Sequence, residues 1–282
     1  MSERLRPQTG EPAGIKPRSF ITRVLTAAVY AIVVIGAVLW GHLPTAIVFG
    51  AMSGLAAAEF YAMERRESRL PNEFFGVAAA AIMPLSASLW GLPGLSATLT
   101  ALIAASLVWH TAFRRTRTAD TAITLFGAVY TGFLLAYLVL VIRTFEAGTA
   151  LALLLIVSVW ANDVFAYLVG STIGRHKLAP AISPKKSWEG FFAGAAVTIA
   201  LWSTAPFFAM FNLEFVQGLL TGAAVALASL IGDLAESRMK REAGVKDSGT
   251  LLPGHGGFLD RLDSLILVCL VAYWVLWWGG VR

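Results

Sequence analysis

Long apolar runs alternate with short polar segments along the whole of this 282-residue chain. Each run is close to the ~20 residues that an α-helix needs to cross the hydrocarbon core of a bilayer. The runs are unbroken stretches of Ala, Leu, Val and Ile, whereas the strands of a membrane barrel would alternate apolar and polar residues. We therefore expect an all-α polytopic transmembrane bundle with about nine spans. The predicted spans are about 20–40, 43–63, 74–90, 95–113, 121–142, 148–170, 190–210, 213–235 and 262–280.

The composition is typical of an integral membrane protein, with 57% hydrophobic residues, 14% charged residues and a mean hydropathy of +0.70. We expect residues 20–282 to form a single membrane domain. Residues 1–19 are polar, basic and rich in Pro and Gly, which predicts a disordered cytoplasmic tail. The first apolar run is too long for the core of a cleaved signal peptide. The single cysteine, Cys269, lies inside a predicted span, which argues against a disulfide framework or a cysteine metal cluster.

The positions of the basic residues predict the orientation. If the N-terminus is cytoplasmic, the inner segments hold 20 of the 22 Lys and Arg residues, and only Arg143 and Arg282 fall outside. The net charge of +5 would also suit nucleic acid. Cations at the cytoplasmic face instead attract anionic lipid headgroups, and the loops lack the aromatic grooves that bind single strands. We expect contact with the lipid bilayer and no nucleic-acid partner.

Four acids stand at one membrane level, at the two ends of the polar connection between the eighth and ninth predicted spans. Asp233 and Glu236 end the eighth predicted span, and Asp260 and Asp263 begin the ninth, each pair at the i, i+3 spacing that shares a helix face. Carboxylates at the edge of hydrocarbon are costly unless they are paired, hydrated or ligated, and oxygen ligands suit Mg²⁺. The alternative for Asp260 is an ordinary acid that caps a helix. For the four together we favour a metal site, with Asp233 and Asp260 as principal ligands.

Two loops on the same predicted side carry the features of phosphate-binding sites. A glycine-rich turn leads into the ninth span, where free N–H groups at a helix start favour anions. A second loop, Ser183–Gly190, holds a lysine pair before another span; such pairs often serve only to anchor topology. The candidate substrate-binding residues in and around these loops are Ser183, Lys185, Lys186, Ser187, Lys240, Arg241, Gly254, Gly256, Gly257 and Arg261.

Three further polar residues inside predicted spans are considered as candidates. Asn162 and Asp163 lie in the cytoplasmic half of the sixth span, and an ionisable residue within the membrane is a functional candidate by default. For Asn162, a hydrogen bond between helices is an equal alternative to a substrate contact. Glu59 lies near the end of the second span, and we expect it to reach toward Arg65 or Arg66 without a functional role.

Several of these segments together resemble the signature of the phosphatidate cytidylyltransferase (CDP-diacylglycerol synthase) family. The segments that carry the resemblance are Ser237–Arg241, Lys246–Gly249, Leu252–Phe258 and Asp260–Asp263. Their spacing matches throughout, and Ser183–Gly190 and the pair Asn162 and Asp163 also resemble family motifs. The similarity covers about residues 160–263, and a pattern of this length is far more specific than a lone glycine-rich loop.

The resemblance implies that the phosphate of phosphatidic acid attacks the α-phosphorus of CTP, giving CDP-diacylglycerol and pyrophosphate in phospholipid biosynthesis. It implies Mg²⁺, with a monovalent cation such as K⁺ as a further family-level expectation, and a multi-pass protein of the bacterial plasma membrane with its site facing the cytoplasm. The expected partners are CTP, phosphatidic acid and the lipid bilayer, with a second copy of the chain as a further candidate that would give a homodimer. The main alternative is a CTP-dependent lipid-alcohol kinase, which would transfer the γ-phosphoryl group.

The expected roles follow from charge and donor type. Asp233, Asp260, Lys246, His255 and Asp263 are the catalytic candidates, and the metal candidates are Asp233, Asp260, Glu236, Asp263 and Asp247. Lys246 would neutralise phosphate charge, and His255 would donate to a phosphate, since phosphatidate is already ionised near neutral pH and needs no strong base. Asp247 is either a ligand or the partner that holds Lys246 and Arg241.

Overall fold

The computed structural model describes residues 17–67, 69–252 and 256–282. Most of the predicted tail therefore lies outside the described residues, and residues 17–19 belong to the first helix. Gly254 and His255 also lie outside them.

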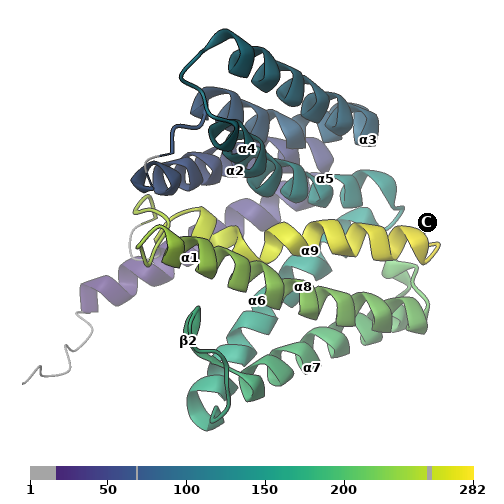
Figure 1. The fold of residues 1–282 in the computed structure, drawn as a ribbon. Coiled ribbons are helices and arrows are strands. Elements are labelled where there is room, and N and C mark those ends of the chain that lie inside the picture. Colours follow the sequence, from purple (N-terminus) through teal and green to yellow (C-terminus); the bar gives the residue numbers. More distant parts are fainter. Residues whose placement is uncertain (1–16, 68, 253–255) are drawn as a thin grey trace, which may run out of the picture.

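Helices make up nearly all of the described chain, and each predicted apolar range contains one (Figure 1). Six helical stretches of the described residues are long and apolar enough to cross a membrane. Most helix ends lie within a few residues of the predicted ones, whereas α8 runs seven residues beyond the end expected at 235, through a charged segment. The helices are α1 (Pro17–Leu39), α2 (His42–Arg66), α3 (Glu73–Ala112), α4 (Thr118–Ala128), the π-helix η1 (Val129–Phe133), α5 (Leu134–Thr144), α6 (Gly148–Ile173), α7 (Trp188–Thr204), the 3₁₀ turns η2 (Ala205–Phe207) and η3 (Ala209–Phe211), α8 (Phe215–Glu242) and α9 (Leu259–Trp278).

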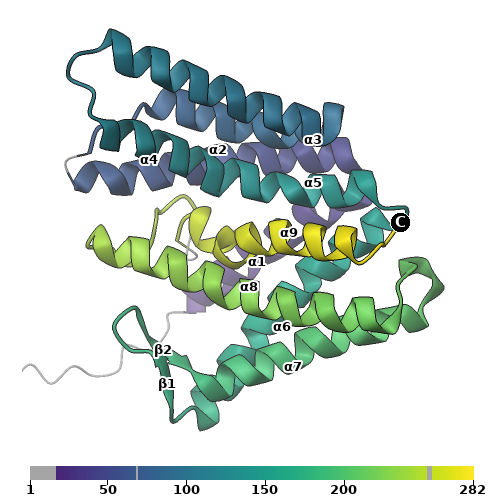
Figure 2. The same ribbon diagram turned by 45° about the vertical axis from the view of Figure 1, so that its right-hand side comes forward.

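Helix α3 contains a reversal that matches the two spans expected at 74–90 and 95–113. Gly91 has φ +67° and ψ −150°, a conformation that is essentially restricted to glycine. The hydroxyls of Ser86 and Thr98 are 2.7 Å apart, although twelve residues of straight helix would separate them by about 18 Å. The two halves of α3 therefore lie side by side, as Figure 2 shows at the top of the molecule.

A short antiparallel sheet joins α6 to α7 and departs from the expectation of loops between helices. Strand β1 (Lys177–Ala179) pairs with β2 (Ser183–Ser187), with Lys177 opposite Ser187. The strands are too short and too polar to show the alternation by which a strand is recognised in sequence. The fold is thus nearly all-α, and this hairpin carries the lysine pair.

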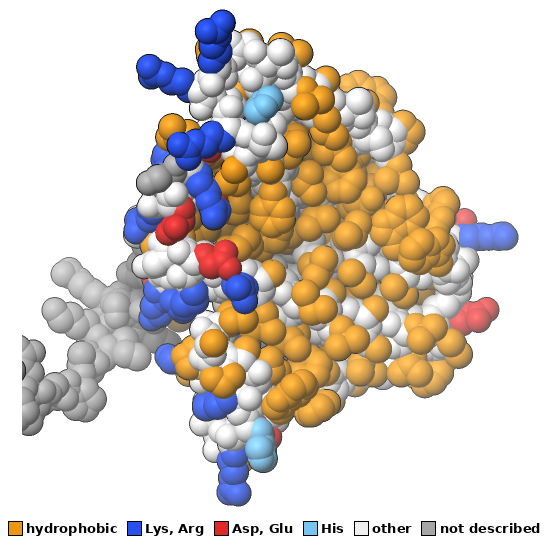
Figure 3. Space-filling view, viewed as in Figure 1, with side chains coloured by type: hydrophobic (Ala, Val, Ile, Leu, Met, Phe, Trp, Pro, Cys, Tyr) orange, Lys and Arg blue, Asp and Glu red, His pale blue; other side chains and the backbone are white. Residues whose placement is uncertain are grey.

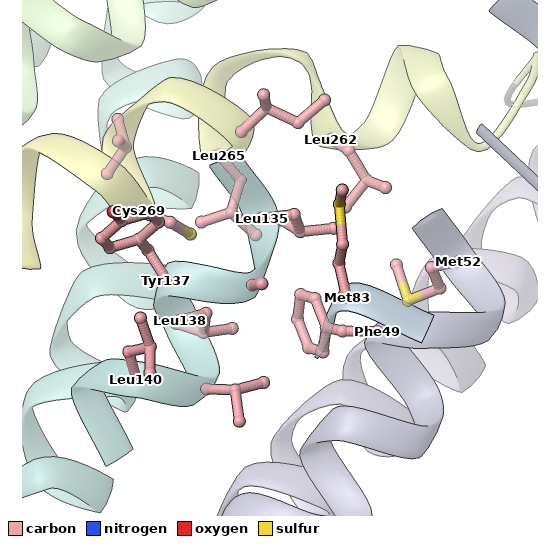
Figure 4. Close-up of a cluster of buried hydrophobic side chains, with 14 of the residues drawn as sticks. Phe49, Met52, Met83, Leu135, Tyr137, Leu138, Leu140, Leu262, Leu265 and Cys269 are labelled. Atoms are coloured by element: carbon pink, nitrogen blue, oxygen red, sulfur yellow. The ribbon is translucent and has the colours of Figure 1, made fainter. Parts of the chain in front are cut away.

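The main hydrophobic core lies where α2, α3, α5 and α9 meet (Figure 4). Phe49, Met83, Leu135 and Leu138 are completely buried there, and Cys269 from α9 lies beside them. Helix α9 packs against α8 as well as α5, while α6, α7 and α8 pack in succession beyond it. This arrangement fixes α9, the helix that follows the signature segment, between the two halves of the molecule.

Charged side chains gather at one end of the molecule. In Figure 3 most of the visible Lys and Arg lie at the left margin, the end that carries the β1–β2 hairpin and the connection from α8 to α9 in Figure 1. Hydrophobic side chains cover most of the remaining surface in that view. The C-terminus lies at the opposite end (Figure 1).

Candidate active site

A cavity of about 580 Å³ opens between α6, α7, α8 and the β-hairpin. Its walls contain residues from three of the motifs that the sequence analysis treated separately. The predicted site residues that line it are Asn162, Asp163, Lys185, Lys186, Ser187 and Asp233. A cavity of this size between helices, with several charged side chains in a partly apolar wall, suits a small ligand that carries charge.

The close approach of α6 and α7 positions the hairpin at the mouth of this cavity. A Cβ on Gly190 would lie 2.6 Å from the carbonyl oxygen of Ala166 and 3.1 Å from the Cα of Gly170, so the two helices touch backbone to backbone. Ser187 ends β2 and caps α7, since its hydroxyl accepts a hydrogen bond from the N–H of Gly190 at 3.2 Å. Lys185 and Lys186, which directly precede Ser187, are thereby held at the cavity.

An ion pair joins the hairpin to α8 across the cavity. Lys186 Nζ lies 2.5 Å from Asp233 Oδ2, and both side chains keep about a quarter of their surface exposed, at 24% and 28%. The other oxygen of Asp233 accepts a hydrogen bond from Ser237 at 3.2 Å. In this arrangement the predicted phosphate-binding lysine and the predicted metal-binding acid neutralise each other.

A second charged cluster is buried between α8 and α9. Lys240 Nζ lies 2.5 Å from Glu236 Oε2 and 2.7 Å from Asp260 Oδ1, and the side chain of Glu236 has no exposed surface. Charges removed from water need such partners, because an isolated buried charge is strongly destabilising. Lys240, which was expected to contact phosphate, thus directs its ammonium group into the protein.

Asp260 accepts hydrogen bonds from several further donors. Its Oδ2 accepts from the backbone N–H of Ser248 at 2.9 Å, from the hydroxyl of Ser248 at 2.9 Å and from the N–H of Gly257 at 2.8 Å. Burial disfavours the ionised carboxyl group of Asp260, but the bonds from Lys240, Gly257 and Ser248 outweigh this and lower its pKa. Both carboxylate oxygens of Asp260 therefore already accept hydrogen bonds. These contacts match the alternative considered from the sequence, in which Asp260 is a capping acid at the start of a helix and not a metal ligand.

Acidic residues from three helices lie near one another. Asp163 (α6) and Asp233 (α8) both line the cavity, and the backbone of Asp263 (α9) packs against Gly232, the residue before Asp233. No three acidic, histidine or cysteine side chains of the described residues are arranged so as to hold a metal ion. The donor chemistry fits Mg²⁺, which takes carboxylate oxygens, although the side chains would have to move to bring these oxygens together.

Other predicted residues lie outside the cavity wall. Arg241 donates to the carbonyl oxygens of Val245 at 3.0 Å and Ile182 at 3.4 Å, which ties the end of α8 to the hairpin. Lys246 and Asp247 are exposed on the connection to α9. Ser183 pairs with Ala179 at the start of β2, and Gly256 forms a bridge with Leu252.

Arg261 borders a separate, mostly apolar cavity of about 300 Å³. The cavity lies between α1, α6 and the connection before α9, and Tyr30, Trp160 and Leu252 also line it. A guanidinium group at the edge of an apolar space suits an amphiphilic ligand with an anionic head.

Two polar residues beyond the predicted set are buried near the acids. Tyr130 lies in η1, and its hydroxyl has no hydrogen-bond partner among the described residues. Isolated π-helical turns often occur at functional sites, but they have no sequence signal. Glu59 does not reach toward Arg65 or Arg66 as expected; it is buried and contacts the signature segment. Its position as an acid within an apolar run was the signal that could have identified it.

Comparison with known proteins agrees with the resemblance in the sequence. The sequence model of the "Cytidylyltransferase family" matches residues 21–278. The phosphatidate cytidylyltransferase of Bacillus subtilis is 33% identical over 260 residues, covering 90% of this chain and 96% of the relative. The phosphatidate cytidylyltransferase of Pseudomonas aeruginosa is 33% identical over 248 residues, covering 83% and 89%. That of Mycobacterium leprae is 42% identical over 159 residues, covering 56% and 50%.

Proposed function

The chain belongs to the cytidylyltransferase family, and we propose that it transfers the cytidylyl group of CTP to phosphatidic acid. A phosphate oxygen of the lipid forms a bond to the α-phosphorus of CTP, and the bond from that phosphorus to the oxygen of the β-phosphate breaks. The products are CDP-diacylglycerol and pyrophosphate. The observation that carries this proposal is the cavity in which Lys186, from the Ser183–Gly190 motif, lies beside Asp233, from the end of the eighth predicted span.

The cavity residues would bind and orient the nucleotide. Lys185 and Lys186 supply positive charge for the triphosphate, and such charge-assisted contacts are stronger than neutral hydrogen bonds. The amide nitrogen of Asn162 is buried without a hydrogen-bond partner among the described residues, so it can donate to a bound ligand. Phosphoryl and nucleotidyl transfer need mainly such positioning and charge neutralisation.

We propose Mg²⁺ as the cofactor. When bound, it would offset the charge that develops on the leaving pyrophosphate. That Asp233 and Asp260 share the ion stays a prediction. Both acids already have partners, Asp233 with Lys186 and Ser237 and Asp260 with Lys240, Ser248 and Gly257, so either would exchange a protein contact for the ion. Glu236 and Asp247 remain candidates for its surroundings, and a monovalent cation such as K⁺ is a further proposal.

The lipid substrate would approach sideways from the inner leaflet. The cavity at Arg261, Tyr30 and Trp160 offers an apolar space with a cation at its border, which suits an acyl chain and a phosphate headgroup. We propose nine spans, a cytoplasmic N-terminus and a site at the cytoplasmic face of a bacterial plasma membrane. The cations gathered at the end that carries the hairpin support this orientation (Figure 3).

The reaction is tested with purified protein, phosphatidic acid and CTP labelled at either the α- or the γ-phosphorus. The proposal expects label from the α-position in the lipid and label from the γ-position in pyrophosphate. Transfer of only the γ-label to lipid would show a kinase and overturn the proposal. An Asp233→Asn protein assayed at low Mg²⁺ should transfer less label than the parent, since it lacks the charged oxygen that faces Lys186.

A further inference from the structure

Glu59 connects the N-terminal half of the chain to the signature segment. Its carboxylate accepts hydrogen bonds from the N–H of Phe258 at 3.1 Å and from the N–H of Leu259 at 2.9 Å. These donors are about 200 positions away in sequence, at the start of α9. The residue before α9, Phe258, has no side chain able to cap the helix, so an acid from α2 does so instead. Negative charge at this helix end is also favoured by the helix dipole.

The contacts of Glu59 continue through a buried chain of polar groups. Ser248 Oγ lies 3.0 Å from Glu59 Oε2 and 2.9 Å from Asp260 Oδ2. A hydroxyl carries one proton, so it donates to only one of these carboxylates at a time. Asp260 in turn pairs with Lys240, which pairs with Glu236. This series of polar contacts therefore links α2 to the acids of α8 and α9.

Two glycines of the signature segment lie directly against the Glu59 carboxylate. A Cβ on Gly249 would lie 2.4 Å from Glu59 Oε1, and one on Gly257 would lie 2.3 Å from Glu59 Oε2. Real Cβ atoms essentially never come this close to another heavy atom. A side chain at either position would therefore have to displace the Glu59 carboxylate from its contacts with this connection.

We propose that Glu59 is a positioning residue for cytidylyl transfer, holding the connection from α8 to α9 and thereby the acids of α9 in place. The inference rests on the proposed function and goes beyond it, because α2 lies outside the signature. Glu59 does not line the cavity with Lys186 and Asp233, so it acts through Ser248 and the start of α9.

The test compares the parent with Glu59→Gln, Ser248→Ala and the double variant. Glu67→Gln is the matched control, since Glu67 is an exposed acid just after the end of the same helix. Turnover, the KM values for both substrates and the Mg²⁺ requirement are measured at a temperature where thermal unfolding shows every variant to be folded. Hydrogen exchange at the N–H groups of Phe258 and Leu259 provides a readout that needs no activity.

We expect Glu59→Gln to lower kcat by about 10- to 100-fold, the value of a lost hydrogen bond to a charged group, with a much smaller change in the KM for CTP. Ser248→Ala should share this effect, so that the double variant loses little more than the worse single variant. Exchange at Phe258 and Leu259 should accelerate in Glu59→Gln. Glu67→Gln should match the parent in every measurement.

Other results would overturn the inference. Parental kcat in folded Glu59→Gln, with only a lower unfolding temperature, would make Glu59 a stabilising residue alone. If the losses of kcat in the two single variants add fully in the double variant, Glu59 and Ser248 act independently of each other. If Glu59→Gln does not fold, the same comparison is made with Glu59→Asp, which keeps the charge and shortens the side chain. A parent without transfer activity would refute the proposed function, while the exchange comparison would still test the contacts.

Discussion

Charged side chains of the site pair with one another. Lys186 pairs with Asp233 at the cavity, and Lys240 pairs with Glu236 and Asp260 beneath it. A triphosphate that takes up Lys186 would leave Asp233 without its partner, and a divalent cation would compensate that charge. Binding of nucleotide and of Mg²⁺ should therefore favour each other.

Replacement of Lys186 by alanine should weaken the use of CTP. The loss of a charge-assisted phosphate contact is expected to cost about 1.5–3 kcal/mol in kcat/KM for CTP. Lys185→Ala should cost less, because Lys185 is exposed at the cavity. Arg69→Ala is the control, since Arg69 pairs with Glu64 away from the cavity. Unchanged activity at limiting CTP in both lysine variants would make this loop a topological anchor only.

The two acids Asp233 and Asp260 should respond differently to replacement by asparagine. Asp233→Asn is expected to raise the Mg²⁺ concentration for half-maximal activity by about tenfold or more. Asp260→Asn removes the negative partner of Lys240 and should lower the unfolding temperature, with a smaller change in the Mg²⁺ requirement. A Mg²⁺ titration combined with thermal unfolding separates the two effects. An equal shift of the Mg²⁺ requirement in both variants would favour the shared ion predicted from sequence.

The helices could be predicted from the apolar runs. The β-hairpin between α6 and α7 and the contacts that the acids make could not. The runs before and after Gly91 were long enough to indicate two spans, and the reversal between them follows. The β-hairpin at Lys186 is too short and polar to show a strand pattern. The capping of α9 by Glu59 depends on packing between distant segments, which one sequence does not reveal. Residue types were thus predictable at the site, but their pairing was not.

The reversal within α3 gives a prediction about a single helical element. Gly91→Ala would place a Cβ on a backbone at φ +67° and ψ −150°, which should destabilise the fold by about 1–3 kcal/mol. Gly36 of α1 is the control, because a Cβ there meets no atom within 4 Å. Alanine also favours a helix more than glycine does, so Gly36→Ala should not lower the unfolding temperature. Equal unfolding temperatures for the parent and Gly91→Ala would show that the reversal is not restricted to glycine.

The molecule as a whole has one end rich in charged side chains and an opposite end with fewer of them. The charged end holds the hairpin and the connection from α8 to α9, and the C-terminus lies at the other end (Figures 1 and 3). CTP is a polyanion that arrives from water, whereas phosphatidic acid stays in the leaflet. In the proposed orientation, this cation-rich end would lie at the cytoplasmic surface, where both substrates could meet at one level of the membrane.

The proposed orientation predicts which positions are accessible from outside the cell. The only cysteine, Cys269, is completely buried, so the parent should not react with a membrane-impermeant maleimide and serves as the background. Arg282→Cys should be labelled on intact cells, because nine spans and a cytoplasmic N-terminus place it outside. Arg115→Cys, at an exposed position between α3 and α4, should be labelled only after permeabilisation. Labelling of Arg115→Cys on intact cells would reverse the orientation. If neither Arg282→Cys nor Arg115→Cys is labelled on intact cells, both positions lie on the cytoplasmic side. The chain would then cross the membrane an even number of times between them.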